Sequence, residues 1–152
     1  MSKLQKIFTI LIALAILPAC GKAPVEVVPV IYEDFTEASR LHVTSPGTFV
    51  FEDNDSWDSF CDEYWGGGIP RPEVDFENNM IIGIFWGQTS GCYEWVNCVR
   101  TVFIRRGVIE VHISPMPDLG DCEMIVYPMQ VIKIRSHELP VEFHGHFPGS
   151  PD

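Results

Sequence analysis

Cys20 is the side chain whose chemistry the surrounding sequence indicates most clearly. Two lysines come first, residues 7–17 follow with one threonine as their only residue that is not apolar, and Ala19 stands directly before the cysteine. This order of a charged, an apolar and a small-residue region is typical of a secretory signal that is cleaved on export. The apolar run is shorter than the roughly 20 residues that a membrane-spanning helix needs. We therefore expect residues 1–19 to be removed.

The four residues Leu17-Pro18-Ala19-Cys20 resemble the lipobox of bacterial lipoproteins, with Pro18 as its least typical position. The resemblance implies that the thiol of Cys20 carries a diacylglycerol and that the residue is acylated with fatty acids such as palmitate. Each buried methylene contributes about 0.8 kcal/mol, so several chains would hold the protein on a membrane without spanning it. Gly21, rather than an aspartate, follows the cysteine. This implies a location in the bacterial cell envelope, at the outer membrane if the cell has one.

Four further cysteines could form two disulfides, as an even number in an exported domain indicates; they are Cys61, Cys92, Cys98 and Cys122. On one extended strand, Cys92 and Cys98 would lie about 20 Å apart, which is too far for a bridge. A hairpin that turns at residues 105–107 would bring Cys92 opposite residue 120, which favours a Cys92–Cys122 bridge and leaves Cys61 for Cys98. A zinc site is disfavoured because no two cysteines are separated by only two residues.

Catalytic chemistry has weaker signals. Ser90 lies in a segment without the Gly-x-Ser-x-Gly motif. His112 alternates with apolar residues and is more typical of a half-exposed strand position than of a general base. The acids Asp75, Glu94 and Glu110 are too scattered to indicate a catalytic pair. We predict no catalytic residue and no cofactor, while an envelope enzyme that uses Ser90 with a histidine, or a reactive thiol pair, remains an open alternative.

Glu142, His144 and His146 could together ligate a metal ion, but no further ligand follows at a recognisable spacing. Their position near the end of the chain favours a flexible polar tail over residues 144–152. We therefore predict no metal site.

The charge of the chain limits its partners. Ten basic and 21 acidic residues give a formal net charge of −11, and removal of the signal with its two lysines leaves 8 basic and 21 acidic residues, a net charge of −13. Such a surface repels phosphate backbones and anionic lipid headgroups. We exclude nucleic acid as a partner and expect any charged partner to be basic.

The hydrophobic pattern predicts the elements that position these residues. The apolar stripe at residues 57, 60, 61 and 64 predicts an amphipathic helix, and the continuous apolar run at 80–86 predicts a strand buried on both faces, by the helix on one side and by sheet on the other. The other strands are expected at residues 48–52, 92–104, 108–114, 122–134 and 140–143. Within the 122–134 stretch, Pro128 implies a bulge, an edge position or two short strands. We predict a mainly β (α+β) fold, an antiparallel β-sandwich or barrel-like domain with one packed helix. It would span residues 31–143, after a lipidated tether at 20–30.

The order of several short motifs resembles that of the protease complex subunit PrcB family, in particular its C-terminal domain. They are the helix around Ser56 to Phe60, the Val74-Asp75-Phe76 segment before strand 80–86, the small-residue loop Gly87 to Tyr93, the loop 115–120, and Tyr127-Pro128 before 131–134 and 141–143. Where this chain has Cys92, that family usually has a second glycine. The resemblance implies an exported, lipid-anchored protein that associates with a protease and is not an enzyme.

These observations predict a non-catalytic protein-binding module on an envelope lipoprotein, with another envelope protein, such as a protease, as its partner. The residues expected to form the recognition surface are Thr89, Ser90, Gly91, Tyr93 and Trp95. The alternative is a binder of small ligands or carbohydrates, in which Trp65, Tyr93 and Trp95 form a stacking platform.

Overall fold

The computed structural model describes residues 25–67 and 70–145. The predicted signal, the lipidation site Cys20, Gly21 and His146 lie outside these residues. In chain order the elements are β1 (Val27–Pro29), β2 (Tyr32–Asp34), the short 3₁₀ helix η1 (Thr36–Ala38), β3 (Pro46–Phe51), α2 (Asn54–Tyr64), β4 (Asn79–Trp86), β5 (Thr89–Gly91), β6 (Val99–Arg105), β7 (Val108–Ile113), β8 (Met124–Val126), β9 (Met129–Arg135) and β10 (Val141–Gly145).

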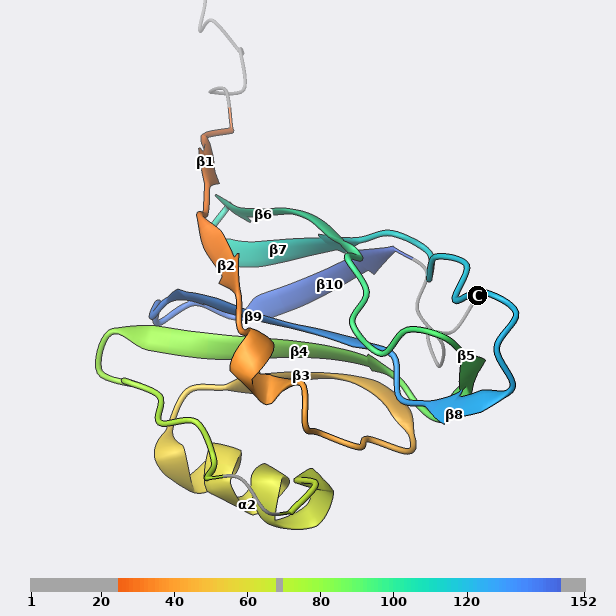
Figure 1. The fold of residues 1–152 in the computed structure, drawn as a ribbon. Coiled ribbons are helices and arrows are strands. Elements are labelled where there is room, and N and C mark those ends of the chain that lie inside the picture. The colour runs from red at the N-terminus through yellow and green to blue at the C-terminus, as the bar shows by residue number, and fades with distance from the viewer. Residues whose placement is uncertain (1–24, 68–69, 146–152) are drawn as a thin grey trace, which may run out of the picture.

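Most strands form two stacked sheets. The first, sheet A, has the order β1-β6-β7-β10 and is antiparallel except that β10 runs parallel to β7; the second, sheet B, has the antiparallel order β2-β9-β4-β3. Strands β5 and β8 form a separate antiparallel pair. Sheet A lies over one face of sheet B and α2 over the other (Figure 1). The predicted fold class, a mainly β sandwich with one packed helix, is confirmed.

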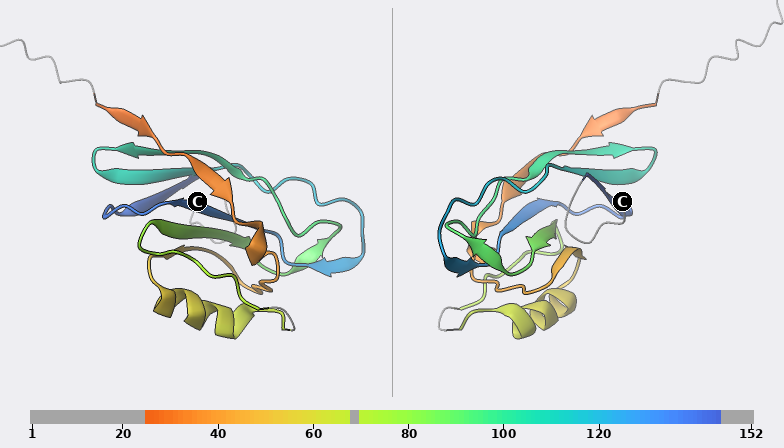
Figure 2. Two further views of the ribbon diagram at one scale, coloured as in Figure 1. Left: turned by 60° about the vertical axis from the view of Figure 1, so that its left-hand side comes forward. Right: turned by 90° about the vertical axis from the view of Figure 1, so that its right-hand side faces the viewer.

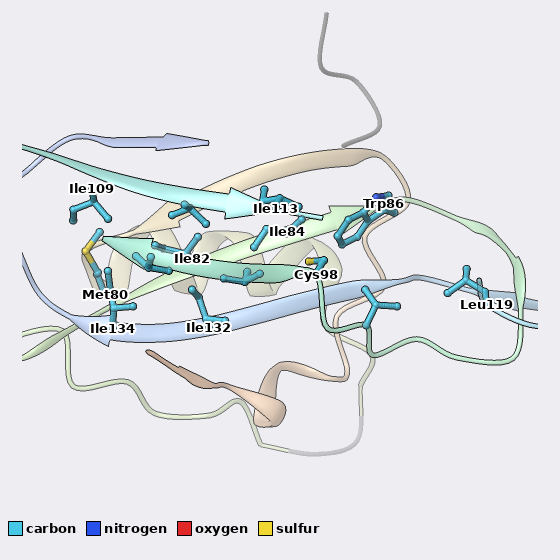
Figure 3. Packing of buried hydrophobic residues seen from close by; sticks show 14 of the residues in the cluster. Met80, Ile82, Ile84, Trp86, Cys98, Ile109, Ile113, Leu119, Ile132 and Ile134 are labelled. Atoms are coloured by element: carbon cyan, nitrogen blue, oxygen red, sulfur yellow. The ribbon is translucent and has the colours of Figure 1, made fainter. Parts of the chain in front are cut away.

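Strand β4 shows why the molecule has three layers. Its side chains alternate between two faces. Met80, Ile82 and Ile84 join the apolar cluster between the two sheets (Figure 3), whereas Ile81 and Phe85 join the cluster between sheet B and α2. Because both faces are covered, the strand reads as a continuous apolar run, as predicted.

Helix α2 begins and packs as its sequence indicates. The side chain of the N-cap residue Asp53 accepts a 2.7 Å hydrogen bond from the backbone N–H of Ser56, which satisfies one of the unpaired donors at the helix start. This bond lowers the pKa of the Asp53 carboxyl. Trp57, Phe60 and Cys61 are buried against sheet B. The 3.6-residue apolar stripe therefore attaches the helix to the sheet.

The second predicted disulfide, Cys61 with Cys98, is wrong. Both cysteines are buried and free. Cys61 belongs to the cluster between α2 and sheet B, and Cys98 to the cluster between the two sheets. Sheet B thus separates the two thiols, a relationship that spacing along the sequence does not reveal.

The strand predicted over residues 92–104 is also shorter than expected, since β6 begins only at Val99. The stretch before it is irregular, and the buried amide of Gln130 rather than a neighbouring strand accepts hydrogen bonds from the N–H groups of Cys98 and Val99, each at 2.7 Å. Of the three alternatives for Pro128, the structure has two short strands, because Pro128 lies between β8 and β9.

The predicted ends of the domain need correction. Within the tether proposed for residues 20–30, β1 pairs with β6, so the fold begins earlier than residue 31. Within the tail proposed for residues 144–152, His144 and Gly145 belong to β10. None of the described helices has the length and apolar character needed to cross a membrane.

Candidate functional site: the β5–β8 face

The predicted recognition loop is built on the small β5–β8 sheet, which lies at one end of the sandwich (Figures 1 and 2). Three backbone pairs define its register: Thr89 with Val126, Ser90 with Ile125, and Gly91 with Met124. Ser90 is exposed and shares a face with its partner Ile125, because opposed residues of antiparallel strands point the same way.

A disulfide fixes this small sheet to the loop that follows β7. Cys92 is bonded to Cys122, with 5.0 Å between their Cα atoms, and the backbone N–H of Cys92 donates a 2.7 Å hydrogen bond to the carbonyl of Leu119. This is the bridge expected from the sequence. It joins segments 30 residues apart and so restrains both sides of the site.

Two glycines allow the close packing around the disulfide. A Cβ atom on Gly91 would lie 2.7 Å from Cβ of Leu119, and one on Gly120 would lie 2.9 Å from Sγ of Cys92. Gly120 also has φ of +78°, a conformation that favours glycine. Gly91 is buried, so this predicted site residue shapes the loop and does not present a side chain to a partner.

Large apolar side chains are exposed around this sheet. Tyr93 is 62% exposed, Met124 55% and Ile125 63%. Together with the half-buried Trp95 they line an open hollow of about 380 Å³. We call the surface formed by Ser90, Tyr93, Trp95, Met124 and Ile125 the β5–β8 face.

The surroundings of the β5–β8 face are acidic. Its two segments, residues 87–98 and 115–128, contain no lysine, arginine or histidine. They contain four acids, all exposed: Glu94, Asp118, Asp121 and Glu123. An apolar centre with an acidic rim complements a partner whose apolar contact residues are flanked by positive charge.

The structure places the other residues predicted for binding at more than one site. Thr89 is half-buried beside the buried Val126. Tyr93 and Trp95 line the same hollow, whereas Trp65, the third member of the predicted stacking platform, lies at the end of α2 and lines a different hollow with Arg40 and Pro70. The platform therefore retains two of its three aromatic residues.

The hydrolase alternative requires a histidine within hydrogen-bond distance of the Ser90 hydroxyl. Among the described residues, no histidine is hydrogen-bonded to the Ser90 hydroxyl, and the segments that form the β5–β8 face contain none. The thiol alternative rests on Cys92 and Cys122, which are joined in the disulfide and partly exposed.

Glu110, His112 and His144 form a second cluster that the sequence did not indicate. Their ligand-type atoms all lie within 4.8 Å of one another. The hydrogen bonds from the Arg105 guanidinium lower the pKa of the Glu110 carboxyl, in opposition to the effect of its burial. Parallel pairing of β7 with β10 places His144 beside His112. If residues 144–145 had been predicted as the end of a strand instead of the start of a tail, the sequence could have indicated that His144 lies near His112.

Comparisons of the chain with family models, with curated proteins and with solved structures find no match.

Proposed function

We propose that the protein is a lipid-anchored envelope protein that binds another envelope protein through the β5–β8 face and does no chemistry itself. The observation that carries this proposal is the exposure of Tyr93, Met124 and Ile125 around one hollow on a disulfide-braced scaffold. Aromatic residues and methionine are enriched at protein interfaces, and tyrosine is frequent among the residues that carry most of the binding energy. A braced scaffold favours binding because little conformational freedom is lost on association.

The chemistry of the face indicates the character of the partner. Its acidic rim and the net charge of −13 that remains after removal of the signal, with 8 basic and 21 acidic residues, favour a protein with a basic, partly apolar surface. The resemblance to the PrcB family supports a protease as this partner, which the lipoprotein would stabilise or inhibit. Acylated Cys20 would hold the protein at the membrane, where it meets exported partners.

The test begins with cross-linking of the full-length lipoprotein in the envelope and identification of the captured protein by mass spectrometry. The purified candidate is then titrated with wild-type protein and with a Tyr93→Ala, Ile125→Ser double variant. Loss of two anchors should weaken binding by at least about 10-fold. Ile31→Ser is the matched control, because Ile31 is 91% exposed but lies just before β2, the edge strand of sheet B.

Three readouts decide the proposal. The control should bind within about twofold of wild type, and binding should weaken as salt screens the acidic rim. If the captured protein is a protease, its half-life and its cleavage rate with and without the lipoprotein distinguish a stabiliser from an inhibitor. Equal affinity of the double variant and the control would contradict binding through the β5–β8 face.

A second candidate function is binding of a small ligand or carbohydrate, which the shared hollow of Tyr93 and Trp95 favours. An oligosaccharide panel titrated against wild type and Trp95→Ala, with tryptophan fluorescence as the readout, tests it. Saturable binding that is insensitive to salt and lost in Trp95→Ala would support this function over protein binding.

A further inference from the structure

The outer face of sheet A carries an unusual set of side chains. Along β7, Ile109, Val111 and Ile113 point into the core between the sheets. The intervening residues Glu110 and His112 therefore point to the opposite face, against which no other described layer packs (Figures 1 and 2). The register of β10 places Glu142 beside Glu110 and His144 beside His112.

Glu110 is buried although it belongs to this outer face. It is 5% exposed and is the one buried charged residue among residues 25–67 and 70–145. Arg105 holds its carboxylate from one side, with Nε 2.7 Å from Oε1 and Nη2 2.8 Å from Oε2. Buried carboxylates need such partners, because removing an ionised group from water is costly.

Two histidines approach the same carboxylate from the other side. His112 Nε2 lies 3.3 Å from Oε2 of Glu110, and His144 Nε2 lies 3.9 Å from that oxygen. The imidazole rings are stacked, with centroids 5.0 Å apart, and the ring of Phe103 stacks on His112 at the same centroid distance. Both Nε2 atoms therefore lie within 4 Å of the same oxygen.

The Nε2 atom of His144 makes no hydrogen bond. It is buried and has no partner, although Oε2 of Glu142 lies 3.7 Å away. A buried nitrogen lone pair or N–H group without a partner is unfavourable. A bound cation would satisfy this nitrogen, the nitrogen of His112 and an oxygen of Glu110 together.

We propose that Glu110, His112 and His144 form a binding site for a divalent transition-metal ion of the zinc type. Imidazole nitrogens and carboxylate oxygens at about 2.0–2.2 Å are ligands that Zn²⁺ accepts. Tetrahedral coordination at that distance requires ligand atoms about 3.3 Å apart, and the three atoms already lie within 4.8 Å of one another. The ring planes of His112 and His144 are only 17° apart, so their in-plane lone pairs are nearly parallel, and metal binding requires side-chain rotation that opens the ring stack.

Arg105 has a positioning role at this site. Its guanidinium can keep the bond to Oε1 of Glu110 while Oε2 turns to the metal, because the two bonds use different nitrogen atoms. Such outer contacts orient the ligating groups of metal sites. Three protein ligands leave a fourth position for water or for the exposed carboxylate of Glu142. The site lies on a different sheet from the β5–β8 face, so it is independent of the proposed function.

The test is a titration of the full-length protein, purified in detergent with a tag that lacks histidine and stripped with a chelator. Isothermal titration with Zn²⁺ should show one ion per chain, and Co²⁺ should give the visible spectrum of a tetrahedral ion. The variants His112→Phe and His144→Phe keep the ring stack but remove the ligand nitrogens. Each should weaken Zn²⁺ binding by more than about 100-fold, since even outer-shell changes cost 10- to 100-fold.

His42→Gln is the matched control, because His42 also stacks on an aromatic ring, that of Tyr127, outside the cluster. It should bind Zn²⁺ as wild type does. Thermal unfolding of each variant without metal shows whether the fold is retained, and added Zn²⁺ should raise the melting temperature only where the cluster is intact. Two results would overturn the proposal: wild-type affinity weaker than about 1 mM, or Zn²⁺ binding that folded His112→Phe and His144→Phe retain.

Discussion

Gln130 on β9 accepts a 2.7 Å hydrogen bond from the backbone N–H of Cys98, just before β6 begins, so one buried side chain joins the two sheets. The same Oε1 atom accepts from the N–H of Val99 at 2.7 Å and from the Cys98 thiol at 3.2 Å, and the amide nitrogen donates to Asp34 at 2.7 Å. A side chain that is 2% exposed thus satisfies donors that no strand pairing reaches.

We expect Gln130→Leu to destabilise the protein strongly. The substitution keeps most of the volume but leaves two buried N–H groups without acceptors, each costing about 1–3 kcal/mol. Denaturant unfolding should show a loss of about 2–4 kcal/mol. Gln88→Leu, at an exposed glutamine, is the control and should stay within about 0.5 kcal/mol of wild type. A similarly small effect of Gln130→Leu would show that these bonds contribute little.

The disulfide should contribute a separate, measurable amount of stability. In the chain-entropy model a bridge closing a 30-residue loop stabilises by about 3–4 kcal/mol. The double variant Cys92→Ser, Cys122→Ser should lose about this much in denaturant unfolding under oxidising conditions. Under strongly reducing conditions, wild type and variant should become equal. A wild type that keeps its advantage after verified reduction would contradict this account.

The two free thiols should be unreactive in the native protein. Burial raises the pKa of the Cys61 thiol to about 11 and that of the Cys98 thiol to about 12, so little thiolate exists near neutral pH. Alkylation at pH 8 followed by mass spectrometry should leave both unmodified until denaturant is added. Rapid native labelling of either residue would contradict their burial.

The same shifts predict a loss of stability at alkaline pH. A thiol whose pKa is raised by folding stabilises the native state fully below its unfolded pKa of about 8.5, and this contribution falls as pH rises towards the folded pKa. For the two thiols the fall extends from about pH 8.5 to the folded pKa values near 11 and 12. In this pH range, the free energy of unfolding of Cys61→Ala and Cys98→Ala should fall less steeply with pH than that of the wild type. Parallel curves would refute the linkage.

Membrane attachment should depend on one residue outside the described structure. Cys20→Ala removes the thiol that the lipobox resemblance assigns to acylation. We expect incorporation of labelled palmitate to be lost and the protein to leave the membrane fraction, because anchoring needs the acyl chains. Cys61→Ala is the control and should retain both properties. Retained palmitate labelling in Cys20→Ala would contradict the assignment.

Local hydrophobic patterns predicted the helix and the central strand, because the burial of each element's faces shows directly in the spacing of its apolar residues. The run from Met80 to Trp86 is apolar on both faces, and sheet A and α2 cover those faces as expected. The stripe of Trp57, Phe60 and Cys61 likewise gave the buried side of α2. In both elements, hydrophobic periodicity and burial have the same physical cause.

Pairings between residues far apart in the sequence could not be predicted from local patterns. The parallel register of β10 on β7 joins residues about 32 positions apart, and no local pattern specifies it, so the grouping of His112 with His144 was missed. The pairing of Cys61 with Cys98 failed for a similar reason, because the sequence does not show that a sheet lies between them. The Cys92–Cys122 bridge was predicted from a hairpin longer than the one formed, since β6 begins only at Val99.

The eight residues from Val27 to Asp34 cover one edge of each sheet, because β1 pairs with β6 and β2 pairs with β9. A proteolytic cut that released this segment would leave two rows of unpaired backbone groups, and such rows are templates for pairing with another chain. The described end of the chain nearest to Cys20 therefore also protects the domain from self-association. A copy clipped from its membrane anchor after residue 34 would be prone to strand exchange and aggregation, whereas one clipped before residue 25 would retain both covered edges.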